Sequence, residues 1–180
     1  TSGEIKVSDQ GVVTGAGFTT RLPVVEASGF PACPVVSGLG IKVSGVLFAE
    51  MLKRVHFATE KDLHVDNRWC FQAIHLQVKD SRLQLAASNE KHLSLATLPI
   101  QSSETREYLI PQLSVKALTS FAASCDEVEL AESDNHFGLL SENGSISTRL
   151  LSGQFPALVD HIPRDWPHVI SMPRSEFEAT

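Results

Sequence analysis

Residues 41–57 read IKVSGVLFAEMLKRVHF, and the spacing of the apolar residues changes inside this stretch. Ile41 and Val43 alternate with polar residues, as they do in a strand that is buried on one side. Ser44 follows, and serine is a favoured cap at the start of a helix. The stretch therefore predicts a strand that leads directly into a helix.

The predicted helix covers residues 45–57 and has two different faces. Its apolar residues recur three and four positions apart, which places them on one side of a helix. The predicted buried line consists of Leu47, Met51 and Val55, with Phe48 and Leu52 beside it. The opposite face carries Glu50, Lys53 and Arg54, and Glu50 stands at ion-pair spacing from Arg54.

The same plan then occurs a second time. Pro111 suits the first turn of a second helix, whose exposed face includes Lys116. The predicted buried stripe of that helix consists of Leu113, Ala117, Leu118 and Phe121. Strand-like runs are found at 69–78, 82–88, 92–98, 108–110, 126–132, 135–141 and 145–151. This order predicts an α+β fold, a pseudo-twofold repeat of strand, helix and antiparallel strands with the helices on one face of the sheets.

A longer repeat indicates tandem domains. Gly29-Phe30-Pro31 corresponds to Gly153-Gln154-Phe155-Pro156, about 125 residues further on, which is the size of a small domain. A strand-like start and a helix-like continuation follow each copy. We therefore expect the C-terminal part of a first domain at 1–36, a complete middle domain at 37–163 and the start of a third domain at 164–180.

The composition excludes several classes of protein. The chain has 180 residues with 15 Lys and Arg against 21 Asp and Glu, a formal net charge of −6. This charge argues against a surface that coats nucleic acid as a whole, but it is compatible with a basic patch on an acidic body. Three cysteines without a CxxC pair make neither a disulfide framework nor a cysteine–zinc site. With no membrane-length apolar run and no signal peptide at its start, we expect a soluble cytoplasmic protein.

Catalytic motifs are missing from the sequence. It contains no GxxxxGK[ST] phosphate loop, no HExxH and no GxSxG nucleophile elbow. The seven histidines are scattered without metal-ligand spacing. We expect no metal, no cofactor and no enzymatic activity, and a hydrolase with an unrecognised site is the weakest alternative.

Three local features have ordinary structural interpretations. His75 lies within an alternating strand, where we expect it at the surface. Glu127 and Glu129 alternate with apolar residues and predict a solvated acidic face. Asn143-Gly144 predicts a tight hairpin turn in which both residues have positive φ.

Cations gather on the two predicted helices and in one loop. Lys53, Arg54 and Lys116 project from the helices. The loop with Lys61, His64, Arg68 and Trp69 combines cations with an aromatic ring, which suits phosphates and a stacked base. The alternative is an ordinary charged helix face beside an ordinary loop.

Five segments carry a resemblance to a known family. They are Phe48-Ala49-Glu50-Met51-Leu52, Leu83-Gln84-Leu85-Ala86-Ala87-Ser88-Asn89, His92-Leu93-Ser94-Leu95, Ile110-Pro111 and, most specifically, Arg149-Leu150-Leu151-Ser152-Gly153-Gln154-Phe155-Pro156. They resemble the bacterial sliding clamp family, the beta subunits of DNA polymerase III. The resemblance covers nearly the whole chain and is centred on the middle of three domains.

The resemblance implies a ring in which two subunits, each of three similar domains, join head to tail with helices lining the hole. Duplex DNA is expected to thread the hole without sequence preference. The ring is then a non-catalytic processivity factor that tethers the replicative polymerase during DNA replication. The DNA-facing residues implied are Lys53, Arg54, Lys61, Arg68, Trp69 and Lys116. The alternative is a clamp-like protein-interaction module that does not encircle DNA.

The resemblance also implies a pocket for short peptide motifs of the polymerase and the clamp loader. The matching positions are Phe71, Ser88, Leu93 and Pro156. Two departures lie nearby: Asn89-Glu90-Lys91-His92 stands where the family usually has Asp-Gly-His-Arg, and Asp160 stands at a commonly basic position. These departures leave open which peptide motif the pocket would bind.

Overall fold

The computed structural model describes residues 4–62, 69–162, 165 and 167–178, and the chain divides into two compact units, 1–33 and 34–180. The first unit is an antiparallel sheet in the order β1-β2-β3, followed by the short 3-10 helix η1. Its elements are β1 (Lys6–Val7), β2 (Val12–Gly15), β3 (Phe18–Arg21) and η1 (Ala27–Gly29). Among its described residues only Gly11 is buried, so this sheet has no hydrophobic core of its own.

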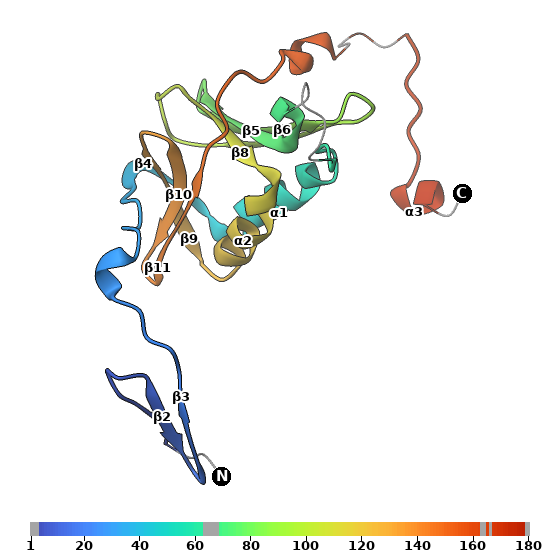
Figure 1. Cartoon of the computed structure of the whole chain (residues 1–180). Coiled ribbons are helices and arrows are strands. Elements are labelled where there is room, and N and C mark those ends of the chain that lie inside the picture. Colours follow the sequence, from blue (N-terminus) through green and yellow to red (C-terminus); the bar gives the residue numbers. More distant parts are fainter. Residues whose placement is uncertain (1–3, 63–68, 163–164, 166, 179–180) are drawn as a thin grey trace. The chain divides into compact units, whose positions relative to one another are not determined.

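The second unit contains two halves with the same order of elements (Figure 1). The first half consists of β4 (Ser37–Ser44), α1 (Gly45–His56), the 3-10 helix η2 (Trp69–Gln72), β5 (Ala73–Lys79), β6 (Arg82–Ser88) and β7 (Leu93–Pro99). The second half consists of β8 (Arg106–Pro111), α2 (Gln112–Ala123), β9 (Glu127–Ser133), β10 (His136–Ser141) and β11 (Gly144–Arg149). The short helices η3 (Leu158–His161) and α3 (Arg174–Glu178) follow. The predicted α+β fold with its pseudo-twofold repeat is confirmed.

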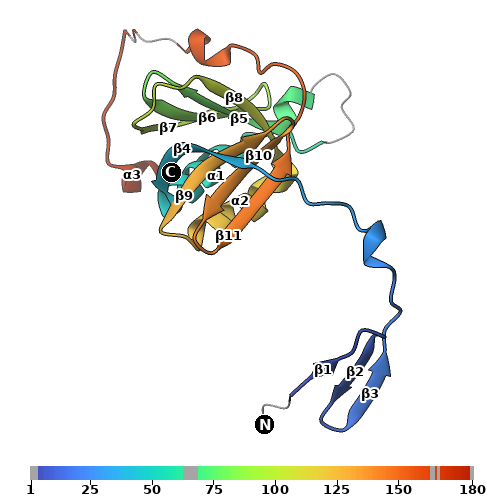
Figure 2. The ribbon, with the colours of Figure 1, turned by 90° about the vertical axis from the view of Figure 1, so that its left-hand side faces the viewer.

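The two halves exchange their first strands. One sheet has the order β11-β10-β9-β4 and the other β7-β6-β5-β8, and all neighbours are antiparallel. Strand β4 thus completes the sheet of the second half, and β8 completes the sheet of the first half. The helices α1 and α2 lie side by side and contact both sheets (Figure 2). None of the described helices has the length and apolar content that a membrane crossing requires.

The start of α1 is fixed by a cap and by a close contact with the second half. The Ser44 hydroxyl accepts a hydrogen bond from the Leu47 N–H at 3.5 Å, which confirms the predicted cap. At the next residue, Gly45, an added Cβ would overlap the carbonyl oxygens of Ala122 and Cys125 at the end of α2. Because only glycine fits there, the sequence places the beginning of one helix against the end of the other.

The buried faces of both helices differ from the predicted ones. Leu47 is 50 % exposed and Leu113 is 74 % exposed, and Ala117 is also exposed. The buried residues are Gly45, Phe48, Ala49, Met51, Leu52 and Val55 in α1, and Val115, Leu118 and Ala122 in α2. Each helix packs against two sheets and its partner helix, so its buried arc is centred between those neighbours. Apolar periodicity alone does not locate that centre.

Three further predictions are wrong in detail. Residues 69–72 form η2 rather than the first part of a strand. In the β10–β11 hairpin Ser141 pairs with Gly144, so the turn is centred on Glu142 and Asn143. Gly144 has positive φ (139°), but it is the first residue of β11 and not a turn residue. Asn143 is not among the described residues with positive φ. His75 is buried, for reasons given below.

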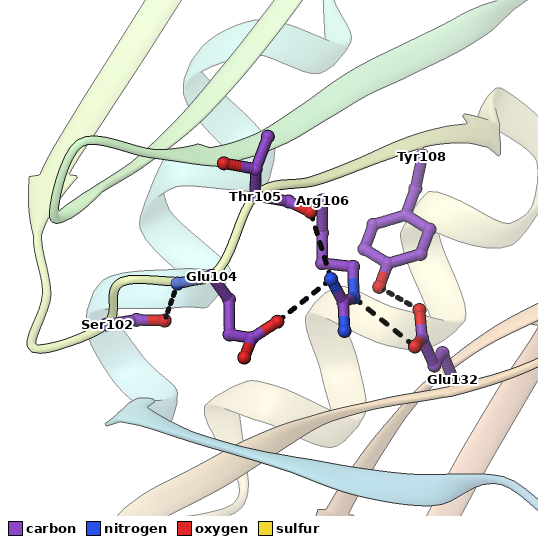
Figure 3. A network of polar contacts seen from close by, with 6 residues as sticks. All are labelled: Ser102, Glu104, Thr105, Arg106, Tyr108 and Glu132. Carbon is purple, nitrogen blue, oxygen red and sulfur yellow. Dashed lines mark hydrogen bonds and ion pairs between the residues drawn. The ribbon is translucent and has the colours of Figure 1, made fainter.

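A polar network joins the two sheets (Figure 3). The Glu132 carboxylate on β9 accepts hydrogen bonds from the Tyr108 hydroxyl and from Arg106 Nε at 3.4 Å, both on β8. Arg106 also forms an ion pair with Glu104 at 2.8 Å. Burial, and then the hydrogen bond and charge of Glu132, raise the pKa of Tyr108 far above its usual value. The phenol is therefore held in its neutral form as a donor between the sheets.

Tyr108 is the chain's only tyrosine, so its titration can be followed directly by the ultraviolet absorbance of the phenolate. We expect no phenolate signal from the folded protein near pH 10, the usual tyrosine range, and a normal titration after unfolding in urea. Because the unfolded state loses this proton first, the free energy of unfolding should fall as the pH rises above about 10. Tyr108→Phe should lack this component of the fall, and a phenol that titrates normally in the folded protein would contradict the network.

Candidate nucleic-acid interface and partner pocket

The charged side chains on the exposed faces of α1 and α2 are mostly basic. Lys53, Arg54 and Lys116 are all exposed, as predicted. The only carboxylate on the two helices is Glu50, whose Oε2 lies 3.5 Å from Arg54 Nη2. Since both partners are largely in water, this pair contributes little stability and leaves Arg54 able to contact another anion.

His56 does not add to this charge. It ends α1 and is half-buried, and its burial lowers the pKa of the imidazole below the usual value. The charge of Lys61 lowers the pKa of His56 further. The imidazole is therefore neutral near pH 7, and the positive charge at this end of α1 comes from Lys53 and Arg54.

The predicted DNA-contacting loop is only partly within the described residues. Arg68 and His64 lie outside them, while Lys61 is exposed and Trp69 is the first residue of η2. The Trp69 side chain is 39 % exposed, and an added Cβ at Gly153 would overlap its indole ring. One side of the indole therefore packs against the backbone of Gly153, and the ring is not fully available for stacking on a base.

The four predicted pocket residues lie on or beside one face of the β7-β6-β5-β8 sheet. We call this the outer face, because it is turned away from the helices. Ser88 pairs with Leu93 across β6 and β7. Ala87 belongs to the main core, so Ser88 and its partner point outward by strand alternation. Phe71 packs edge-on against Phe155, which precedes Pro156, with ring centroids 6.3 Å apart.

A small second hydrophobic core lies on this outer face. It consists of Phe71, Ala73, Ala86, Leu109 and Phe155. The chain after β11 is attached there by a hydrogen bond from the Leu151 N–H to the Leu109 carbonyl at 3.0 Å. The segment 151–156 thus lies over the outer face and carries Phe155 and Pro156 to it.

His75 and Phe155 also belong to this cluster, although neither was predicted as a pocket residue. His75 is 7 % exposed, contrary to its predicted surface position. Its ring stacks on Phe155 with centroids 5.0 Å apart and planes 9° from parallel, and Phe155 excludes water from it. His75 shares the outward side of β5 with Ala73, Gln77 and Lys79, so the local sequence gives no signal of its burial. Alternation alone predicts a polar surface and does not reveal a covering segment.

The turn that departs from the family pattern has a defined conformation. Asn89 Oδ1 accepts hydrogen bonds from the N–H groups of Lys91 at 3.2 Å and His92 at 2.9 Å. The Ser88 hydroxyl accepts one from the Glu90 N–H at 3.1 Å. Glu90 has φ +69°, in the left-handed region that favours glycine. Its side chain therefore occupies a position where the backbone suits a glycine. The other departure, Asp160, is exposed in η3.

Acidic side chains gather away from the helix faces. A groove of about 450 Å³ is lined in part by Lys42, Asp126, Glu127, Glu129 and Glu142. The hydrogen bond and charge of Glu127, 3.0 Å from Lys42 Nζ, raise the pKa of that lysine. Glu129 accepts a hydrogen bond from the Gly40 N–H at 2.8 Å. The alternation predicted for this strand is confirmed, and within the described residues no cluster of three potential metal ligands occurs.

Comparison with known proteins gives consistent matches. Residues 42–157 match the protein family described as DNA polymerase III beta subunit, central domain. The beta sliding clamp of Rickettsia bellii (strain RML369-C) is 22 % identical, over 98 % of this chain and 49 % of the relative. The beta sliding clamp of Chlamydia pneumoniae is also 22 % identical, over 80 % of this chain and 39 % of the relative. The chain therefore spans half or less of these relatives' lengths.

Solved structures share the fold. The DNA polymerase III subunit beta of Pseudomonas aeruginosa superposes with a TM-score of 0.76 at 20 % identity, covering 89 % of this chain and 44 % of that one. The DNA polymerase sliding clamp of Bacillus subtilis gives a TM-score of 0.77 at 19 % identity, covering 91 % and 44 %. These matches establish the fold of this chain.

Gly153→Ala tests the packing of Trp69 on the segment 151–156. Gly153 (φ +120°) and Gly144 (φ +139°) have similar backbone conformations, but an added Cβ at Gly144 meets open space. We expect Gly153→Ala to lower the free energy of unfolding by about 1–3 kcal/mol more than Gly144→Ala does, the usual penalty of overpacking. Urea unfolding measures the difference, and equal losses would show that the indole does not occupy this position.

Glu90→Gly tests the strained turn. Relief of the left-handed conformation should offset the extra freedom of the unfolded chain, so the free energy of unfolding should stay constant or rise by up to about 1 kcal/mol. Lys91→Gly, without positive φ in the native protein, should instead lower it by about 0.5–1 kcal/mol. Thermal unfolding of both variants checks this, and similar losses would contradict it.

Proposed function

The chain belongs to the DNA polymerase III beta subunit family, whose central domain it contains, and from this premise we propose that it forms part of a sliding clamp. In this proposal the clamp encircles duplex DNA and tethers the replicative polymerase during DNA replication. It contributes topology and tethering and no catalytic chemistry. It works in the cytoplasm, where bacterial DNA is replicated.

The distribution of charge is the observation that carries the proposal. The chain as a whole has a net charge of −6. The two helices α1 and α2 nevertheless carry Lys53, Arg54 and Lys116 against the single carboxylate of Glu50. All three cations are exposed, and within the described residues neither lysine has an ion-pair or hydrogen-bond partner. This basic surface on an acidic body suits a polyanion that touches one face of the protein.

Contacts of this kind suit a clamp that moves along DNA. Lysine and arginine bind phosphates without reading the bases, so every position along the duplex is nearly equivalent. A few exposed cations give weak, salt-sensitive binding, and retention then depends on the closed ring. In this proposal Lys61, Trp69 and Arg68 add contacts beside the helices.

We further propose that the chain includes parts of three domains, at 1–36, 37–163 and 164–180, and that two complete subunits join head to tail. The division of the chain between residues 33 and 34 supports a boundary near residue 36. The lack of a hydrophobic core in the β1-β2-β3 sheet supports its assignment to part of a domain, because such a sheet needs further elements to bury an apolar face. The outer face with Phe71, Ser88, Leu93 and Pro156 is proposed to bind short peptide motifs of the polymerase and the clamp loader.

Neutralising the three helix cations tests the DNA-facing role. In the full-length protein, Lys53→Gln, Arg54→Gln and Lys116→Gln together should weaken binding to duplex DNA. The slope of log affinity against log salt concentration should become shallower by about 0.9 for each phosphate that is no longer neutralised. Folding should be unaffected, because all three side chains are exposed.

A matched control removes the same charge elsewhere. Lys79, Arg82 and Lys91 are exposed and lie outside the helices, and their replacement by glutamine should leave the salt slope unchanged. An equal change in both triple variants would mean that net charge, and not the helix surface, governs binding. Negative-stain images of the full-length protein test encirclement: compact particles without a hole would favour a clamp-like protein-interaction module.

A further inference from the structure

His75 is the one buried histidine among the described residues, and neither the core nor the DNA-facing surface accounts for it. It lies in the middle of β5, on the outer face, between apolar neighbours that point into the main core. An apolar side chain could be buried there without leaving a polar group unpaired, whereas a buried imidazole needs a hydrogen-bond partner. The residue that hydrogen-bonds the imidazole and the aromatic ring that stacks on it indicate what His75 does.

The partner is Glu107 on the adjacent strand β8. His75 Nε2 lies 2.6 Å from Glu107 Oε1. In the β5–β8 register His75 faces Leu109 and Gln77 faces Glu107, so the two residues are diagonal neighbours. The Glu107 side chain is 54 % exposed while the imidazole is buried. The carboxylate therefore keeps its hydration and fixes the orientation of a ring that is otherwise surrounded by apolar groups.

The oriented imidazole fixes Phe155 in turn. It stacks on one face of the phenyl ring, while Phe71 meets the same ring edge-on at 84°. A face contact and an edge contact hold an aromatic ring in two perpendicular directions. Phe155 is thereby held in place, and with it the backbone that leads into Pro156.

We propose that Glu107 and His75 are positioning residues for the partner pocket. They hold Phe155, and through it Pro156, in the arrangement that binds a partner peptide, and they do not touch the peptide themselves. The inference rests on the proposed peptide-binding function. To that function it adds the hydrogen-bonded pair of Glu107 and His75, which lies behind the pocket and influences the affinity for the peptide.

The test uses the full-length protein and a fluorescein-labelled peptide from the clamp-binding segment of the replicative polymerase. Glu107→Ala should weaken peptide binding by about tenfold, in line with the removal of a hydrogen bond to a charged group. Glu107→Gln should restore most of the affinity, because its amide can still hydrogen-bond His75. Glu142→Ala removes an exposed carboxylate from the β10–β11 turn and is the charge-matched control, with no expected effect.

Two further measurements separate positioning from a loss of folding. His75→Phe keeps an aromatic ring and its burial but removes the hydrogen bond to Glu107, and it should fold normally and bind the peptide several-fold less tightly. In a Trp166→Phe background, the fluorescence of Trp69 reports on the segment 151–156, because the indole packs on Gly153. Its emission should shift to longer wavelength in Glu107→Ala and return in Glu107→Gln.

The outcomes are distinct. Absence of peptide binding by the unmodified protein would remove the proposed pocket itself. Normal binding by Glu107→Ala or by His75→Phe would overturn the positioning role while leaving the pocket intact. Equal losses of affinity in Glu107→Ala and Glu107→Gln would also overturn it, because the proposed hydrogen bond would then have no influence.

Discussion

The close contact between the beginning of α1 and the end of α2 is the constraint on which the rest of the second unit depends. The Gly45 N–H donates a hydrogen bond to the Asp126 carbonyl at 3.0 Å, and no side chain fits at residue 45. At this point the chain passes from β4 into α1 and from α2 into β9. The contact therefore sets the register in which Ser44 faces Glu127, and β4 joins the sheet of the other half. The antiparallel helix pair, the shared core and the outward helix faces all follow from it.

The same arrangement separates two kinds of surface. The helices bury one side against both sheets, so the side with Lys53, Arg54 and Lys116 has no neighbour in the described chain. The carboxylates of β9 and the β10–β11 turn lie on the sheet side instead. Cations on the helix surface attract phosphates, and acidic groups elsewhere disfavour binding of DNA in other orientations. In the proposed clamp, the direction from which DNA approaches would thus follow from how the helices pack.

Much of the fold could be predicted from the sequence, because its elements are long enough to show a period and end in recognisable caps. Ser44 and Pro111 marked the helix starts, and the run at 82–88 coincides with β6.

What could not be predicted depends on contacts between distant segments. Leu47 and Leu113 are apolar but exposed, because the position of a buried arc depends on neighbouring elements. His75 is buried by Phe155, which is far away in sequence and has no periodic relation to β5. The positions of the exposed helix cations were predicted correctly, since polar residues on a helix surface depend on local spacing alone.

The exchange of first strands also determines how the second unit can be assembled during synthesis. The hydrogen bond between Gly40 and Glu129 spans 89 residues of sequence, so β4 has no strand partner until β9 has left the ribosome. Such long-range pairing raises the contact order and slows folding. Until then β4 exposes an unpaired edge, and with it a risk of pairing with another chain. Neither half can act as an independent folding unit, and a break in the chain between β7 and β8 should yield two pieces that fold only together.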